Sequence, residues 1–436
     1  MELVSQLEKW QVIAAAVIFL LCYALIVTEK INRAVIALAG ALLMVVLGIV
    51  DLQAAYERHI EWQTIFLLVG MMLLVGIAAR SGMFQYAAIK TAQAAGGNPT
   101  RILLLLSLMT AVGAALLDNV TVVLLMVPIT IAIARVLHIS PLPFLVSEII
   151  SANIGGTATL IGDPPNIMIG SATNLDFNDF LIHLGPPVVI ILAVSLLLVV
   201  WAYRSHLLVS RIHQQELMNV DARAYIVDRK LMVKSLVVLA LTLLGFFLHA
   251  VLHVEAAVVA VAGATLLMLI GVKEEELDET FRSVEWVTIF FFAGLFVLVG
   301  GLVESGIIGK LATSVMQVTE GNIAFTSLLI LWISGIASAT IDNIPFVATM
   351  IPLVQDIGVQ MNATDTALEP VWWSLALGAC LGGNGTLVGA SANLIAAGIA
   401  SREGYRITFV DFLKIGVPVT LVSLLVSTAY VAWVLV

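Results

Sequence analysis

Long apolar runs separated by short polar segments make up most of the first half of the chain. Runs long enough to cross about 30 Å of hydrocarbon as a helix lie at residues 11–28, 34–50, 62–79 and 185–203. Two further apolar stretches, residues 102–137 and 144–171, have polar residues near their middle. The pattern predicts four ordinary membrane-spanning helices and two segments of a different kind.

Each of these two segments has its own kind of interruption. Asp118 and Asn119 divide residues 102–137 into two apolar arms, which predicts a re-entrant hairpin with its tip inside the membrane. Residues 144–171 contain the sequence GGTATLIGDPPN, whose glycines and prolines disfavour helix. This predicts a helix broken at mid-depth, which is tolerated where irregular backbone is surrounded by protein or lines a cavity.

The same order of segments repeats in the second half of the chain. Asp118 and Asn119 match Asp342 and Asn343 at an offset of 224 residues. The sequence IGGTATLIGDPPN of the first half aligns with LGGNGTLVGASAN of the second half. A short amphipathic segment precedes each hairpin and predicts an interfacial helix; these segments are residues 84–95 and 307–318.

The duplication predicts an all-α membrane protein with two repeats, residues 1–203 and 235–436, joined by a cytoplasmic linker, residues 204–234. If each repeat has five crossings and one hairpin, the odd number inverts the second repeat, as in many secondary transporters. With the N-terminus outside, 17 of the 20 Lys and Arg residues lie on the inner side. The positive-inside rule therefore favours ten spans with both termini outside.

Composition agrees with this class and excludes others. The chain is 61% hydrophobic and 11% charged, with a mean hydropathy of +1.08, as expected for a polytopic membrane protein. Its two cysteines, Cys22 and Cys380, lie in different apolar segments, which argues against a disulfide framework or a thiolate metal cage. The net charge of -9 argues against a nucleic-acid partner. We expect no cofactor apart from a coupling ion.

Asp118 and Asp342 are the most informative candidates, because a carboxylate in an apolar membrane segment is costly. At a hairpin tip, free carbonyls, the amides of Asn119 and Asn343, and the hydroxyl of Thr121 can replace the water shell of a small cation. We interpret both tips as sodium-type sites with these aspartates and asparagines as ligand candidates. The alternative is that the aspartates only cap the second arm of each hairpin.

The interruptions of the two broken helices provide further candidates. Glycine lets backbone approach a ligand closely, and half-helix ends present oriented N–H and carbonyl groups. The candidates are Gly155, Gly156, Thr157, Thr159, Asp163 and Asn166 in the first copy, and Gly382, Gly383, Asn384, Thr386, Ser391 and Asn393 in the second. The alternative is that these small residues only allow helices to pack closely.

The two copies differ in charge, because Asp163 of the first aligns with Ala390 of the second. No Lys or Arg lies inside a predicted core segment, so we expect the acidic pocket to lack a basic partner. Such a pocket repels an anion unless cations or protons accompany it, which predicts cation or proton coupling. Glu148 is interpreted either as a proton-relay residue or as a residue at a helix end near the interface.

Four motifs, LDNVTVVLLMVPIT, IGGTATLIGDPPN, IDNIPFVATMIP and GACLGGNGTLVGASAN, resemble the ion transporter superfamily, and the resemblance covers nearly the whole chain. It is closest to the permeases grouped with the pigmentation P protein, arsenite-efflux permeases and sodium/proton antiporters, with a citrate-transporter-like domain. The more distant divalent-anion/sodium symporters carry Ser-Asn-Thr at their hairpin tips. From that pattern only Asn119 and Asn343 carry over as sodium-site residues.

The resemblance implies a homodimer in the lipid bilayer, in which hairpins and broken helices move as an elevator against a scaffold. We interpret the chain as a secondary active transporter of the cell (inner) membrane, coupled to sodium or protons. Cation/proton exchange is favoured, with Asp163 contributing to proton coupling. The alternative substrate is a small inorganic, metalloid or carboxylate anion, such as citrate.

Two other classes of protein are less consistent with the sequence. An intramembrane aspartyl protease needs a Gly-x-Gly-Asp loop, but Leu160, Ile161 and Gly162 precede Asp163. No HExxH or nucleophile-elbow pattern is present either, so we expect no enzyme. A passive channel is compatible with hairpins but is not favoured by a duplicated closed pocket.

Overall fold

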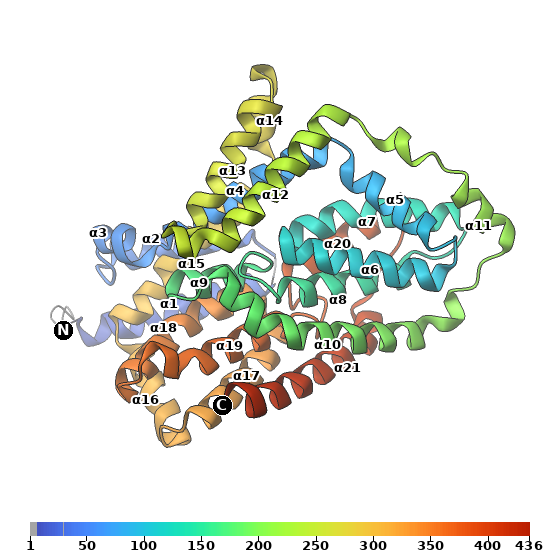
Figure 1. The fold of residues 1–436 in the computed structure, drawn as a ribbon. Helices are drawn as coiled ribbons and strands as arrows, with labels where there is room; N and C mark the ends of the chain where they lie inside the picture. Colours follow the sequence, from blue (N-terminus) through green and yellow to red (C-terminus); the bar gives the residue numbers. More distant parts are fainter. Residues whose placement is uncertain (1–6, 29) are drawn as a thin grey trace.

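The computed structural model describes residues 7–28 and 30–436, and within these residues the chain is helical, with no β-strand (Figure 1). The all-α class is confirmed. Residues 1–6, which belong to the predicted first repeat, lie outside the described residues.

The helices of the first half follow the predicted order of segments. They are α1 (Lys9–Thr28), α2 (Arg33–Val46), α3 (Leu52–Ala54), η1 (Ala55–His59), α4 (Trp62–Arg80), α5 (Met83–Ala94), α6 (Pro99–Leu116), α7 (Asn119–Val136), α8 (Leu142–Gly156), α9 (Pro164–Ala172) and α10 (Phe177–Tyr203). The predicted first hairpin corresponds to α6 and α7, and the predicted broken helix to α8 and α9. The predicted interfacial segment forms α5.

The linker and the second half contain the remaining helices. They are η2 (Arg204–His206), α11 (Arg211–Met218), η3 (Ala222–Tyr225), α12 (Arg229–Leu252), α13 (Ala256–Gly271), η4 (Glu274–Glu276), α14 (Leu277–Arg282), α15 (Trp286–Glu304), α16 (Ile307–Thr319), α17 (Ile323–Thr340), α18 (Asn343–Met361), α19 (Asp365–Gly382), α20 (Ser391–Arg402), α21 (Phe409–Tyr430) and η5 (Val431–Leu435). Helices α17 and α18 form the second hairpin, and α19 and α20 the second broken helix. The second predicted interfacial segment forms α16.

Local sequence determines where the hairpin arms begin. Asn98 and Asn322 are the N-cap residues of α6 and α17, and each side chain accepts a hydrogen bond from the backbone N–H three residues later. Gly82 and Gly306 precede α5 and α16 with φ angles of +81° and +68°, a conformation that favours glycine. The two copies therefore enter their hairpins through the same local geometry.

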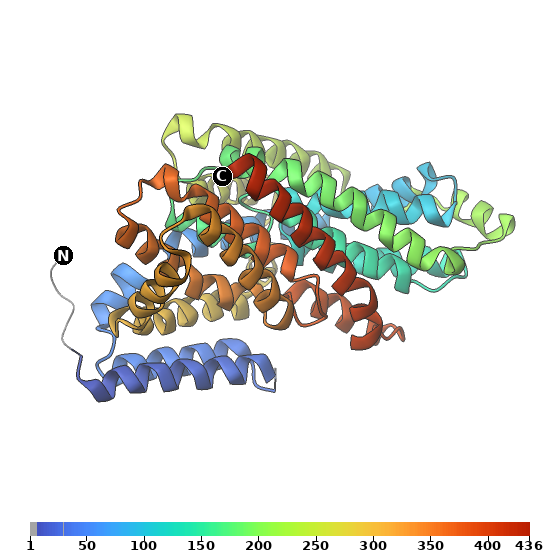
Figure 2. The ribbon, with the colours of Figure 1, turned by 90° about the horizontal axis from the view of Figure 1, so that it is seen from below.

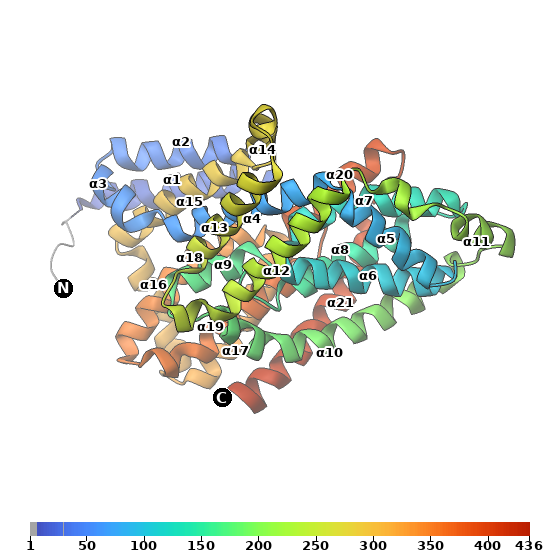
Figure 3. The ribbon, with the colours of Figure 1, turned by 45° about the horizontal axis from the view of Figure 1, so that its top comes forward.

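The two hairpins come from opposite ends of the molecule (Figures 1 and 3). Helices α6 and α7 lie at one end with α5 and α11, whereas α16, α17 and α18 lie at the other. Each broken helix packs against both hairpins: α8 contacts α6 and α9 contacts α18, while α19 contacts α17 and α20 contacts α7. The breaks and the hairpin tips are thereby brought together in the interior.

Glycine allows the closest of these helix contacts. A Cβ atom at Gly155 would lie 2.1 Å from the carbonyl oxygen of Ala111, and one at Gly382 would lie 2.5 Å from that of Gly335. These glycines let α8 pack on α6 and α19 on α17 with backbone against backbone. Close packing is thus one role of the predicted glycines.

A second group of helices flanks the hairpins, and Figure 2 shows α1 and α2 as an antiparallel pair along one edge. Gly294 of α15 packs on the backbone at Ala37 of α2, and Gly70 of α4 packs in the same way on Ala260 of α13. These matching contacts form two equivalent helix pairs outside the hairpins, and each pair has one helix from each half of the chain.

Ten helices in the described residues are long and apolar enough to cross a membrane. The number equals the predicted number of spans, but the members differ. The set includes all four hairpin arms, while α2, α8 and α13 are shorter apolar helices. Length and composition alone therefore do not distinguish a re-entrant hairpin from a pair of spans.

The polar linker is more ordered than its lack of apolar periodicity indicates. It contains α11, and α12 begins at Arg229, before the predicted boundary. The Gln93 side chain of α5 donates a hydrogen bond to the carbonyl oxygen of Val220 at 2.7 Å, and the backbone N–H of Val227 donates to Ser81. The linker is thus fastened along α5.

Candidate functional site

The hairpin tips place their aspartates at the start of the second arms. Asp118 Oδ1 accepts a hydrogen bond of 2.8 Å from the backbone N–H of Thr121, and Asp342 Oδ1 accepts one of 3.0 Å from Ile344. Both aspartates are therefore N-caps, as the capping alternative predicts. Since capping uses one carboxylate oxygen in each case, the second oxygen of each aspartate is available to a different partner.

The breaks in the two helices are held by equivalent asparagines. Asn166 Nδ2 donates to the carbonyl oxygens of Thr157 and Thr159, at 3.1 and 2.9 Å, and Asn393 Nδ2 donates to those of Gly383 and Thr386, at 2.8 and 3.0 Å. These asparagines are fully buried. They satisfy carbonyl groups that the interrupted helices leave without intrahelical partners.

Threonine hydroxyls connect the breaks to the hairpins. Thr159 Oγ1 donates to the carbonyl oxygen of Ala115 at 2.5 Å, and Thr386 Oγ1 donates to that of Ala339 at 2.6 Å. Thr157 Oγ1 instead donates to the carbonyl oxygen of Asn153 within its own helix, at 2.8 Å. The predicted threonines thus fix the backbone of the site.

A network of buried asparagines joins the two copies. Asn119 of the first hairpin tip donates to Asn153 Oδ1 at 3.2 Å. Asn153 in turn donates to Asn384 Oδ1 at 2.9 Å and to Asn393 Oδ1 at 2.8 Å. The first hairpin tip is therefore linked through α8 to the break of the second broken helix.

The second hairpin tip makes the converse link to the first copy. Asn343 Nδ2 lies 3.4 Å from each carboxylate oxygen of Asp163, and both side chains are buried. Asn166 accepts a contact of 3.5 Å from the Cys380 thiol of α19. The predicted tip and break residues thus lie in one interior cluster built from both halves of the chain.

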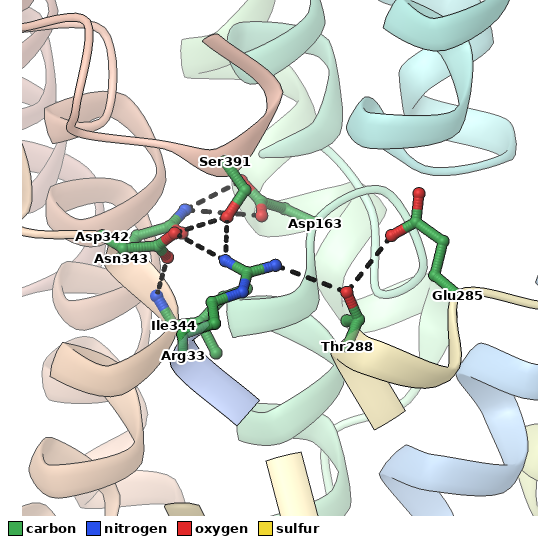
Figure 4. Close-up of polar contacts among 8 residues, drawn as sticks. All are labelled: Arg33, Asp163, Glu285, Thr288, Asp342, Asn343, Ile344 and Ser391. Atoms are coloured by element: carbon green, nitrogen blue, oxygen red, sulfur yellow. Dashed lines mark hydrogen bonds and ion pairs between the residues drawn. The ribbon is translucent and has the colours of Figure 1, made fainter. Parts of the chain in front are cut away.

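Asp342 has a basic partner, which contradicts the expectation of a pocket without one. Arg33 Nη1 at the start of α2 lies 3.2 Å from Asp342 Oδ2 (Figure 4). Ser391 Oγ donates to the same carboxylate oxygen and accepts from Arg33. The prediction failed because Arg33 flanks a spanning segment in the sequence but reaches the interior through its long side chain.

Asp118 has a different electrostatic environment. Within the described part of the chain it has no ion-pair partner, and its side chain is 6% exposed. Asp163 likewise has neutral hydrogen-bonding contacts only. One carboxylate of the predicted three is therefore neutralised by arginine, and two are not.

Glu148 lies inside the molecule rather than near a helix end at the interface. It is 1% exposed, within α8, and Thr130 of α7 donates a hydrogen bond of 2.6 Å to its Oε1 atom. Its Oε2 atom is buried without a hydrogen-bond partner among the described residues. Burial of one unpartnered oxygen favours the neutral carboxylic acid over the carboxylate.

Sequence reasoning missed four residues of the site. They are Arg33, Asn153, Glu285 and Thr288. Asn153 had a detectable signal, because it is an amide in an apolar helix and aligns with Cys380 in the second copy. Arg33 has no acidic or basic counterpart in the other copy, so the duplication did not reveal it.

The resulting arrangement is rich in oxygen ligands and poor in groups for covalent chemistry. Carboxylates, side-chain amides and backbone carbonyls surround the tips and breaks, and such hard oxygen donors suit alkali and alkaline-earth cations. Protonation of the same carboxylates would also remove their charge. The groups of the site are therefore suited to binding small cations or protons rather than to covalent chemistry.

Comparisons with known proteins agree with the resemblance found in the motifs. Residues 23–378 match a family model described as citrate transporter. An uncharacterised transporter of Mycobacterium tuberculosis (strain ATCC 25618 / H37Rv) is 44% identical over 421 residues, which cover 96% of this chain and 97% of that protein. The P protein of Mus musculus is 34% identical over 500 residues, covering 96% of this chain and 60% of the P protein.

A solved structure shares the architecture. The Alcanivorax borkumensis YdaH transporter matches with a TM-score of 0.56 over 97% of each chain. The sequence identity is 13%, so this likeness concerns the fold alone. It supports an all-helical transporter fold for the whole described chain.

Proposed function

Because this chain belongs to the citrate transporter family of secondary transporters, we propose that it couples transport to a sodium ion or proton bound at the hairpin tips. The family is one of membrane transporters, so the chain is a multi-pass membrane transporter and not an enzyme. The proposal concerns the coupling ion, the substrate and the residues that bind them.

The observation that carries the proposal is the interior cluster of unneutralised carboxylates. Asp118 and Asp163 are buried, and neither has an ion-pair partner in the described residues. A buried carboxylate needs a cation or a proton to offset its charge. We propose that sodium binds near Asp118 and Asn119, and near Asp342 and Asn343, and that Asp163 exchanges a proton.

We further propose two inverted repeats, residues 1–203 and 235–436, joined by a cytoplasmic linker, residues 204–234. Hairpins that come from opposite ends of the molecule support this arrangement (Figure 1). The hairpins and broken helices would move together as an elevator against a scaffold made of the remaining spans. Homodimerisation, the cell membrane as location and external termini belong to the same proposal.

Cation/proton exchange is the favoured activity, since acidic residues outnumber basic ones in the cluster. Coupled transport of a small anion, such as citrate, is the second candidate. Two observations favour it: the matched family is described as citrate transporter, and Arg33 brings a guanidinium to the site. Guanidinium is well suited to bind a carboxylate.

Purified protein in proteoliposomes tests the proposal. Sodium and pH gradients are imposed separately, and uptake of radioactive sodium, proton movement and citrate uptake are measured. We expect at least one gradient to drive flux in the parent, and flux to disappear in D118N and D342N. Flux that ignores both gradients, with parental flux in both variants, would contradict the proposal.

A further inference from the structure

Arg33 connects two groups of helices. Its Nη1 atom contacts Asp342 Oδ2 at 3.2 Å and Ser391 Oγ, and its Nη2 atom donates to Thr288 Oγ1 at 3.3 Å (Figure 4). The guanidinium also lies over the Phe291 ring, 4.9 Å from its centroid. Every polar partner of this guanidinium therefore lies on a helix other than its own.

The groups around the Arg33 guanidinium belong to two different sets of helices. Arg33, Thr288 and Phe291 belong to α2 and α15, which pack together through Ala37 and Gly294. Asp342 belongs to the second hairpin tip, and Ser391 begins the second half of a broken helix. The ion pair thus joins the α2–α15 pair to the hairpin and broken-helix group.

The equivalent position in the other copy lacks this arginine. Gly70 packs on Ala260 as Gly294 packs on Ala37, so Ala256 of α13 corresponds to Arg33 of α2. Ser391 also has no hydroxyl counterpart, because it aligns with Pro164. The ion pair between Arg33 and Asp342 therefore occurs at one hairpin tip only and is not a consequence of the duplicated fold.

A cavity lies next to the ion pair between Arg33 and Asp342. A cavity of about 240 Å³ is lined by Asn32, Arg33, Asp342, Ser391 and apolar side chains of α1, α15 and α20. The side chain of Arg33 is 26% exposed and that of Asp342 is 15% exposed. A small hydrated cation can thus reach the carboxylate, and the guanidinium has room to withdraw.

We propose that Arg33 is a tethered cation that competes with sodium for Asp342 and holds the unloaded transporter in one conformation. When sodium binds Asp342, the carboxylate no longer needs the guanidinium, and the contact between the two helix groups is released. Without sodium, separating the groups leaves a part-buried carboxylate unpaired, which is unfavourable. Arg33 thereby makes separation of the two helix groups unfavourable in the transporter that has no sodium bound.

This inference rests on the proposed function, and the test separates the two. Proton movement and citrate uptake driven by a sodium gradient are measured in proteoliposomes, from the same starting pH, for the parent, R33Q, R33K and R101Q. Arg101 is a matched control because it is an exposed arginine in the first turn of α6 that makes no side-chain hydrogen bond among the described residues. Because D342N is expected to abolish flux, D342N and the double variant R33Q/D342N are compared by the shift in melting temperature that sodium produces in detergent, which completes a mutant cycle.

Loss of the competitor should strengthen sodium binding. If Arg33 occupies Asp342 in at least four-fifths of unloaded molecules, R33Q lowers the half-saturating sodium concentration at least about fivefold. Flux in the absence of sodium also rises in R33Q. R33K has a smaller effect, R101Q resembles the parent, and R33Q causes no further change when Asp342 is already Asn.

Several results would overturn the inference. An unchanged or weaker sodium dependence in folded R33Q would do so, as would an additional effect of R33Q in the D342N background. Loss of citrate uptake in R33Q without tighter sodium dependence would make Arg33 an anion ligand instead. A parent driven by pH but indifferent to sodium overturns the competition while leaving proton-coupled transport intact; indifference to both gradients contradicts the proposed function itself.

Discussion

Asn343 of the second hairpin tip holds its side-chain amide 3.4 Å from both carboxylate oxygens of Asp163, a residue of the first broken helix. The two residues are 180 positions apart and come from different halves of the chain. A single neutral amide donor does not compensate a buried carboxylate. A change of charge at Asp163 should therefore have a strong effect on transport.

Substitution D163N should abolish coupled flux while leaving the fold intact, since asparagine has nearly the same shape and removes only the charge. Gradient-driven flux in proteoliposomes measures this, with the melting temperature in detergent as a check of folding. D278N is the control, because Asp278 is exposed on α14. Parental flux and unchanged ion dependence in D163N would remove Asp163 from the coupling site.

Substitution N153A should destabilise the protein. Asn153 makes three side-chain hydrogen bonds to Asn119, Asn384 and Asn393 and is fully buried. A buried polar group left without its partner costs about 1–3 kcal/mol. Thermal unfolding in detergent should therefore show a lower melting temperature for N153A than for the exposed control N174A; equal melting temperatures would mean that the network is not stabilising.

Two glycines in the broken helices should respond oppositely to alanine. In G155A the new Cβ atom would collide with the backbone at Ala111, and because backbone cannot rotate away, we expect a loss of at least about 1–3 kcal/mol. Gly398 lies in helix α20 with nothing within 4 Å of its Cβ position. G398A should be neutral or stabilising by up to about 1 kcal/mol. Similar losses in both variants, measured as melting temperatures, would contradict the packing argument.

Glu148 is expected to be a neutral carboxylic acid. Glutamine keeps its shape and can still accept the hydrogen bond from Thr130, so E148Q should stay within about 1 kcal/mol of the parent. Melting temperatures of the parent, E148Q and E148A test this, with E148A expected to be the least stable. If E148Q lost about 3 kcal/mol or more, Glu148 would be a charged and paired group in the fold.

His59, which lies outside the spanning segments, should make the stability of the protein depend on pH. Its Nε2 atom lies 3.3 Å from Glu304 Oε1, but burial lowers the pKa of His59 below its ordinary value of 6.5. The folded protein then binds fewer protons at this residue than the unfolded chain, so stability is lost as pH falls below about 6.5. The melting temperature of the parent should fall more than that of H59Q between about pH 7.5 and 5.5. The same pH dependence in both proteins would contradict this assignment.

The hairpins and broken helices could be predicted from the sequence because the motif of each occurs in both halves of the chain. Asp118 and Asn119 recur as Asp342 and Asn343, and the structure puts these residues at the starts of α7 and α18. Interruptions by glycine and proline also predict where helices end, since both residues disfavour helix. These features depend on local sequence and on the duplication.

The charge balance of the site could not be predicted in the same way. Arg33 is 309 residues from Asp342 and precedes an ordinary apolar helix. Its role depends on how α2 packs beside the second hairpin tip, and no pattern in the chain specifies that contact. Asn153 gave a signal as an amide within an apolar helix, but the duplication did not reveal its role, because the aligned residue of the other copy is Cys380.

The central claim is that the buried carboxylates bind a cation and a proton in alternation. Cation-induced proton release tests it directly: sodium is added to purified protein in weakly buffered detergent solution, and a pH-sensitive dye records the protons released. The account predicts release from the parent and none from the triple variant D118N/D163N/D342N. No release from the parent, or equal release from the folded triple variant, would contradict it.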